Sequence, residues 1–332
     1  MTILARILRY HLGMSQSGKP RPYRVGFYLV PQFPMLAFAA ALEPLRAANR
    51  LSGRALYDWT LFSRDGRPVR ASNGIEVAVR HAAGDPRTVD LMLACAGTHE
   101  PKAAAPAVAK WLRALSRSGA SLGGISLGAY VLADAGLLDG RRCAVHWENL
   151  AAFAERFPRV RAAQDIFAID GDRYTCSGGT AALDMMLHVI GEREGRTLAS
   201  AVSEQFIHPR IRDTRESQRM AVQSRIGAAN PRLIAAVELM EFGEETHSVH
   251  AIAQAVGVSP RQLERLFAHH LDESPSRYYM KARLARARAM LLQTTRPILD
   301  VAVAAGFATA SHFSRCYRAA YGRRPSDERS VR

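Results

Sequence analysis

The chain contains little cysteine, with four residues in 332 and no C-x-x-C pair. Their wide spacing argues against a disulfide framework and against a zinc site built from paired thiols. It is typical of unpaired thiols in a reducing cytoplasm, and we expect neither a metal nor a cofactor. The cysteines are Cys95, Cys143, Cys176 and Cys316.

We expect neither a membrane span nor a secretory leader. The most apolar stretch, 27–45, is interrupted by prolines, a glutamine and a glutamate, so a buried strand followed by a helix explains it better than a membrane span. The opening segment carries Arg6, Arg9 and His11, and no small-residue cleavage site follows it. We therefore expect a cytoplasmic protein without a membrane partner, in which residues 1–20 form a basic flexible tail.

Acidic residues are scarce relative to basic ones. The chain has 45 Lys and Arg against 30 Asp and Glu, a formal net charge of +15. This excess favours nucleic acid or another anionic surface as a partner, although a generally basic proteome would produce the same balance. The length and the 48% of hydrophobic residues allow two domains, each with its own core.

Residues 21–214 alternate between strand and helix patterns, which predicts an α/β domain. A mostly parallel sheet covered on both faces, as in a flavodoxin-like sandwich, follows from such repeated strand–helix units. The expected strands are 23–30, 57–63, 75–79, 89–97, 141–147, 166–170 and 173–179. The expected helices are 35–53, 104–117, one opening at Leu127 and a long one from Ala181.

From residue 233 to 332 the pattern is wholly helical, and 215–232 reads as a polar, basic linker. Two segments, 250–271 and 298–322, share one design. In each, a short apolar helix ends at a glycine, a capping Ser259 or Thr309 follows, and the next helix is apolar on one side only. This design is typical of a helix-turn-helix with a polar recognition helix.

The polar faces of these two helices are the predicted DNA-binding surface. A pair of ordinary helical hairpins with solvated faces is the alternative, but two such segments at matched spacing make it weaker. Residues 261–332 also carry 14 Lys and Arg against 6 Asp and Glu. The candidates for contacts with bases or nearby phosphates are Arg261, Gln262, Arg265, Ser311, His312 and Arg315.

Residues 249–329, with "SPRQLERLF" and "AAGFATASHFSRCYRAAYGRRPSDER", closely resemble the AraC-type transcription-factor domain. The resemblance implies that the linking helix holds two recognition helices apart, so that they enter successive major grooves about 34 Å from each other. Asp272 stands where relatives usually carry a glycine, so we expect a left-handed backbone there, which Asp tolerates.

In the first domain, Gly124-Ile125-Ser126-Leu127-Gly128 matches the G-x-S-x-G nucleophile elbow of serine esterases. His146 and Glu148 could supply a base and an orienting acid. The turn Gly178-Gly179-Thr180 opens a helix, where free N–H groups favour an anion. The alternative is that these residues have only structural roles. The glycines would then be needed only for close packing, and His146 and Trp147 would be core residues.

A second resemblance covers "GGISLGAYVLADAGLLDGRRCAVHWENLAAFAERFP" and "DRYTCSGGTAALDMMLHVI". These segments are similar to the class I glutamine amidotransferase-like (PfpI-like) domain found fused to AraC-type domains. Catalytic members of that family carry a cysteine at the elbow and an acid on the first helix. Here the elbow holds Ser126, and "MLAFAAA" of the first helix has no acid. We therefore expect a sensor and not an enzyme, with a serine hydrolase using Ser126 as the alternative.

The two resemblances together imply a homodimeric transcriptional regulator, expected to activate a catabolic operon with RNA polymerase as a partner. The chain resembles the regulators of arginine, glycine betaine and carnitine catabolism in design. Their resemblance implies a small amino acid or a quaternary or methylated amine as the effector. We expect it to bind at Ser126, Leu127, His146, Trp147, Glu148, Gly178, Gly179 and Thr180.

Overall fold

The computed structural model describes residues 21–97, 105–218, 222–227, 230–243, 247–294 and 296–328. The predicted basic tail lies outside these ranges. The chain divides into two compact units, Met1–Gln218 and Arg219–Arg332, so the division falls inside the linker expected at 215–232. No helix in the described ranges is long and apolar enough to cross a bilayer.

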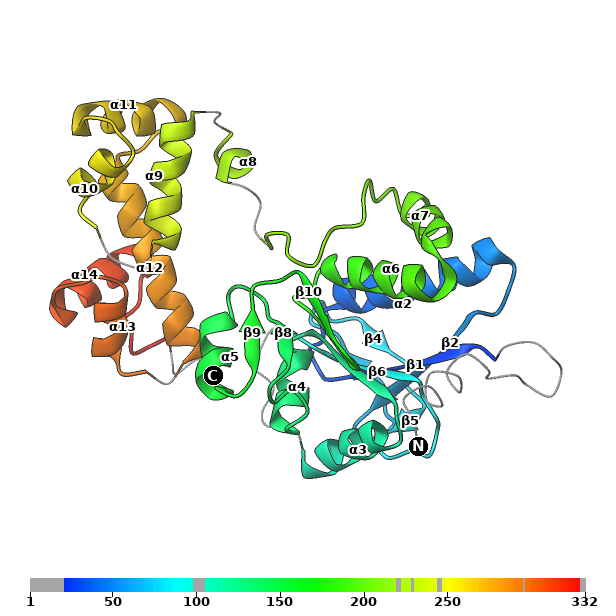
Figure 1. Cartoon of the computed structure of the whole chain (residues 1–332). Coiled ribbons are helices and arrows are strands. Elements are labelled where there is room, and N and C mark those ends of the chain that lie inside the picture. Colours follow the sequence, from blue (N-terminus) through cyan, green and yellow to red (C-terminus); the bar gives the residue numbers. More distant parts are fainter. Residues whose placement is uncertain are drawn as a thin grey trace. The chain divides into compact units, whose positions relative to one another are not determined.

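The first unit is built on a seven-stranded sheet in the order β10-β11-β7-β6-β1-β2-β5 (Figure 1). All neighbouring strands are parallel except β10 and β11, which confirms the mostly parallel α/β prediction. The strands are β1 (Tyr23–Leu29), β2 (Tyr57–Ser63), β5 (His81–Ala82), β6 (Leu91–Ala96), β7 (Ser121–Ser126), β10 (Phe167–Asp170) and β11 (Arg173–Cys176).

Helices cover both faces of this sheet, because alternate residues of the central strands enter two different cores. In β6, Leu91, Leu93 and Cys95 belong to one core, while Met92 and Ala94 belong to the other. The first core contains α2 (Met35–Ser52), α6 (Ala181–Glu194) and α7 (Arg196–Gln205). The second contains α3 (Pro106–Arg117), α4 (Gly128–Asp134) and α5 (Leu150–Arg156).

Two predicted strands do not enter the main sheet. The stretch 75–79 contributes only β4 (Glu76–Val77), which pairs antiparallel with β3 (Val69–Arg70) after a turn at Gly74. The stretch 141–147 contributes β8 (Arg142–Ala144), paired with β9 (Arg161–Ala163). Both are short because turns and charged side chains bound them. Arg142 at the start of β8, for example, forms a bidentate ion pair with Asp165 at 2.6 and 2.9 Å.

The second unit is helical throughout its described ranges, as expected, and contains two small cores. One gathers α9 to α11 around Leu263 and Phe267, and the other gathers α13 and α14 around Phe313 and Tyr317. The long α12 contributes to both cores, so it links the two helix-turn-helix motifs. The helices are α8 (Val222–Ile226), α9 (Pro231–Phe242), α10 (Val249–Ala255), α11 (Pro260–Leu271), α12 (Pro275–Gln293), α13 (Ile298–Ala304) and α14 (Ala310–Tyr321).

Side-chain caps fix the start of both recognition helices. The Ser259 hydroxyl accepts the Gln262 N–H at 3.2 Å, and the Gln262 side chain accepts the Ser259 N–H at 2.8 Å, which is a capping box. Thr309 caps α14 in the same way by accepting the His312 N–H. At the end of α11, Asp272 has φ of 52°, which confirms the predicted left-handed backbone.

Candidate functional site

The elbow predicted at Ser126 is present. Ser126 ends β7 with φ of 56°, and α4 begins two residues later. A Cβ at Gly128 would lie 1.9 Å from the Ala94 carbonyl oxygen, and one at Gly124 would lie 2.4 Å from the Ala129 nitrogen. Glycine is therefore required at both positions because the helix starts in contact with the sheet.

The turn after β11 lies directly against the elbow. Gly178 has φ of 102°, and a Cβ there would be 2.9 Å from the Ser126 Cβ and 3.0 Å from its Oγ. The pairing of Cys176 with Ile125 across β11 and β7 produces this approach. Two groups of predicted site residues, Ser126 and the turn from Gly178 to Thr180, are thus brought together.

The backbone N–H of Leu127, a predicted ligand-binding residue, already has a partner. That N–H donates to the Ala96 carbonyl oxygen at 3.0 Å, because the elbow closes onto the end of β6. At the start of α6, the Ala181 and Leu183 N–H groups donate to Gly178 and Thr180 carbonyl oxygens. The Ser126 and Thr180 side chains add two hydroxyl groups that can donate to a carboxylate ligand.

His146, Trp147 and Glu148 form a loop after β8. The His146 and Trp147 rings are 5.5 Å apart and both are half-buried. Burial lowers the pKa of His146, against a smaller opposing effect of the Glu148 charge 3.8 Å away, so the imidazole is neutral near pH 7. Throughout the described ranges no hydrogen bond joins His146 to Ser126, so an aligned catalytic pair is not formed.

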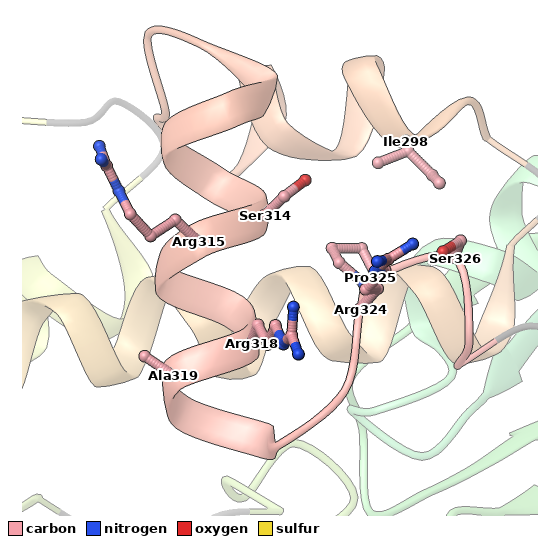
Figure 2. A pocket seen from close by; sticks show the side chains of 8 residues that line it. All are labelled: Ile298, Ser314, Arg315, Arg318, Ala319, Arg324, Pro325 and Ser326. Carbon is pink, nitrogen blue, oxygen red and sulfur yellow. The ribbon is translucent and has the colours of Figure 1, made fainter.

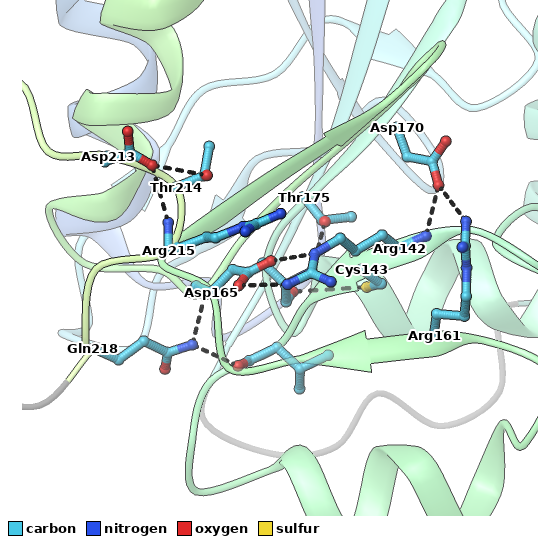
Figure 3. A network of polar contacts seen from close by, with 12 residues as sticks. Arg142, Cys143, Arg161, Asp165, Asp170, Thr175, Asp213, Thr214, Arg215 and Gln218 are labelled. Atoms are coloured by element: carbon cyan, nitrogen blue, oxygen red, sulfur yellow. Dashed lines mark hydrogen bonds and ion pairs between the residues drawn. The ribbon is translucent and has the colours of Figure 1, made fainter.

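Side chains from 208–218 bond both to the loop that carries Trp147 and to the turn at Thr180. The Gln218 side chain accepts the Trp147 N–H at 2.8 Å and donates to the Val145 carbonyl oxygen. It also donates to the Asp165 carbonyl oxygen (Figure 3). The Arg212 guanidinium donates to the Thr180 hydroxyl at 2.7 Å. Gln218 and Arg212 were outside the predicted site because a polar, basic stretch without a strand pattern resembles a linker.

A buried carboxylate anchors the same segment. Asp184, in the first turn of α6, is fully buried. Its oxygens accept the His208 Nε2–H at 2.9 Å, the Arg212 backbone N–H at 2.8 Å and the Arg212 side chain at 2.6 and 2.9 Å. An aspartate on the apolar face of "AALDMML" is the sequence signal for this partner, since an unpaired buried charge is costly.

All six predicted DNA-binding side chains are exposed on their recognition helices. Leu263 and Phe267 of α11, and Phe313 and Tyr317 of α14, point into the cores. Gln262 also caps its own helix, so its carbonyl oxygen is engaged while its amide N–H groups remain for other partners. The roles of individual side chains on DNA stay predictions.

The first unit is an α/β sandwich, and the second carries two helix-turn-helix motifs that share one connecting helix. Together they define the class of two-domain DNA-binding regulators. Family models agree with both halves. A helix-turn-helix domain matches residues 252–330, and the DJ-1/PfpI family matches residues 33–192.

Relatives match nearly the whole chain. The HTH-type transcriptional regulator GbdR of Pseudomonas aeruginosa is 46% identical over 309 residues, 93% of this chain and 84% of the relative. The regulators CdhR and ArgR of the same organism are 45% and 42% identical, covering 92% and 94% of this chain and 91% and 94% of theirs. A crystal structure of an AraC family transcriptional regulator from Pseudomonas putida is 33% identical with a TM-score of 0.52, covering 56% of this chain and all of that one.

The chain belongs to the AraC-type transcriptional regulators that carry an N-terminal DJ-1/PfpI domain. It is a DNA-binding transcriptional regulator.

Proposed function

We propose that the first unit senses a small metabolite and that its occupancy controls transcription of a catabolic operon. One observation carries the proposal: the segment that leads into the DNA-binding unit is bonded to both parts of the candidate site, to Trp147 through Gln218 and to Thr180 through Arg212. A ligand that reorients either part changes the contacts of this segment, which is the differential interaction that a population shift needs.

The proposed effector is an amino acid or a quaternary or methylated amine. The half-buried Trp147 indole offers a face for a cationic head group, and the exposed Glu148 carboxylate suits a guanidinium. The Ser126 and Thr180 hydroxyls would donate to a carboxylate in place of the backbone groups that are engaged. The Nδ1 of neutral His146 accepts the Glu148 N–H at 3.3 Å, so its Nε2–H would donate a hydrogen bond to the effector.

A ligand panel tests this proposal. Arginine, glycine betaine and carnitine are each added while thermal unfolding of the first unit is followed by tryptophan fluorescence, since Trp59, Trp111 and Trp147 all lie in that unit. An effector at about 100 times its Kd should stabilise the unit by about 2.7 kcal/mol. The same compound should change binding to promoter DNA.

Trp147→Ala should remove the stabilisation, whereas the matched control Trp59→Ala, on β2 outside the candidate site, should retain it. If no compound of these classes alters either unfolding or DNA binding, the sensor proposal fails. A first unit that only dimerises would then remain.

We further propose that the protein acts in the cytoplasm as a homodimer that binds repeated half-sites and activates transcription through RNA polymerase. The two recognition helices of each chain support binding along one face of DNA. Sedimentation of the purified protein and a promoter-reporter assay test these points. A monomer at micromolar concentration, or lower reporter output with the regulator present, would contradict them.

A further inference from the structure

A hollow beside the second recognition helix has a composition that suits an anion. It has a volume of about 660 Å³ and lies between α14, the start of α13 and the loop after α14 (Figure 2). Three of its lining residues are arginines and none is acidic. The lining residues are Ile298, Ser314, Arg315, Arg318, Ala319, Arg324, Pro325 and Ser326.

We propose that Arg318 and Arg324 bind a phosphate group of the DNA backbone in this hollow. Figure 2 shows the Arg318 and Arg324 side chains on the same side of α14, while Arg315 extends from the other side of this helix. Two guanidinium groups from separate elements can bind different oxygens of one phosphate, each with two N–H donors. The proposal deepens the DNA-binding function and does not depend on the sensor.

Arg318 and Arg324 have no anionic or carbonyl partner in the described ranges, unlike the arginines of the second unit whose charge is already paired. In the described part of the chain, Arg225 pairs with Glu241, Arg288 and Arg323 pair with Glu328, and Arg286 donates to the Glu241 carbonyl oxygen. No ion pair or side-chain hydrogen bond of Arg318 or Arg324 occurs in those same ranges. Their charge is therefore available to an external anion.

The loop that carries Arg324 is held in place before any anion arrives. The Arg324 backbone N–H donates to the Asp327 carboxylate at 3.0 Å, and the Asp327 N–H donates to the Arg324 carbonyl oxygen. Pro325 and Glu328 are buried, and Glu328 pairs with Arg288 of α12 at 3.2 Å. A fixed loop lowers the entropy lost when the arginine binds.

DNA is the source of the phosphate because of where the hollow lies. It adjoins the exposed face of α14, which carries Ser311 and Arg315. A recognition helix in the major groove has backbone phosphates on both sides, and contacts to them set its position without reading sequence. Arg318 and Arg324 would therefore position α14, while Arg315 contacts base edges.

The salt dependence of DNA binding tests the proposal without a known operator. The full-length protein is titrated onto a fluorescent duplex of mixed sequence, about 30 bp long, at several KCl concentrations. Each phosphate contact contributes about 0.9 to the slope of log K against log[KCl]. Arg318→Ala and Arg324→Ala should each lower the magnitude of the slope by up to about 0.9, and should weaken binding at low salt.

Arg54→Ala in the first unit is the matched control, since it removes the same charge from an exposed arginine outside the DNA-binding unit; its slope should equal that of the wild type. Arg318→Lys should keep most of the slope, because the charge remains, and circular dichroism checks that each variant is folded. Slopes unchanged in both alanine variants would overturn the proposal while leaving DNA binding intact. Tight binding of inorganic phosphate alone, with unchanged slopes, would also overturn it, whereas a wild type that binds no duplex would overturn DNA binding itself.

Discussion

Single glycines decide how closely the elements around Ser126 approach. Gly178 combines a left-handed backbone with contact to Ser126, whereas its neighbour Gly179 has φ of 54° and open space where a side chain would be. Substitution of Gly179 therefore costs backbone strain alone, whereas substitution of Gly178 costs backbone strain and a steric clash.

Gly178→Ala should destabilise the first unit more than Gly179→Ala. At position 179 the left-handed backbone costs about 1–2 kcal/mol. At position 178 a Cβ would also sit 2.9 Å from the Ser126 Cβ, which adds about 1–3 kcal/mol of overpacking. Urea unfolding followed by tryptophan fluorescence measures both, and equal losses would show that the turn relaxes away from Ser126.

Burial makes three of the four thiols inert. It raises the pKa of Cys143 to about 12 and that of Cys176 to about 11, and it holds the pKa of Cys95 well above the usual value. In Cys176, N–H groups of Gly178 and Ser126 oppose the shift without cancelling it. Only Cys316 is partly exposed.

A disulfide reagent applied to the native protein near pH 7.5 should therefore modify one thiol quickly and the other three only on unfolding, because the thiolate is the reactive form. Cys316→Ser should abolish the fast phase. Rapid modification of Cys176 in the native protein would contradict the burial of the elbow.

At the scale of elements, 208–218 behaves as the last structural segment of the first unit. Asp184 holds its first half through His208 and Arg212, and Gln218 holds its end. Between them, the Thr214 carbonyl oxygen accepts the Ile166 N–H at 3.0 Å. Asp184 is fully buried and is hydrogen-bonded to His208 and Arg212. Removing one partner of such a buried pair is costly, because the other partner is left without its counter-charge.

Asp184→Ala should release this segment and destabilise the unit by about 3–5 kcal/mol, since His208 and Arg212 lose their shared partner. Limited trypsin digestion should then cut faster at Arg210 and Arg215, which are exposed side chains on the released stretch. Glu192→Ala, an exposed residue on the same helix, is the control and should leave digestion unchanged. An unchanged rate in Asp184→Ala would mean that other contacts suffice.

The sequence predicted the elements with strong periodicity and missed those fixed by tertiary contacts. Caps at Ser259 and Thr309 and the apolar stripes of α11 and α14 are local signals, so both helix-turn-helix motifs were predictable. The partners of Arg212 and Gln218 depend on chain folding and left no local pattern. The partner of the Leu127 N–H was not predictable either, because a pattern cannot show that a neighbouring strand accepts this N–H.

At the scale of the whole molecule, the two units have separate cores, and all three tryptophans lie in the first. Tryptophan fluorescence therefore reports on the first unit alone, whereas far-ultraviolet circular dichroism reports on both. Comparing the two signals follows each unit in the intact chain.

Acid should weaken the first unit through Asp90, which accepts hydrogen bonds from Arg24 and Arg21 at the start of β1. Burial opposes ionisation of Asp90, but these bonds outweigh it and lower its pKa to about 2 from a usual 3.8. Because the pKa of Asp90 is lower in the folded than in the unfolded state, its ionised carboxylate stabilises the folded unit at pH values above the unfolded pKa. This stabilisation is lost as the pH falls from about 4 to about 2. With both arginines partly exposed, we expect on the order of 2 kcal/mol near pH 7 and about half of that near pH 3.

Asp90→Asn should therefore lower the urea midpoint of the fluorescence transition near pH 7, and the difference from the wild type should shrink as pH falls towards 3. The urea midpoint of the circular dichroism change assigned to the second unit should stay the same. Asp139→Asn is the control, because Asp139 pairs with Arg159 at an exposed position where such a pair contributes little. A difference between Asp90→Asn and the wild type that stays constant from pH 7 to 3 would mean that the geometry of Asp90, and not its charge, stabilises the start of the sheet.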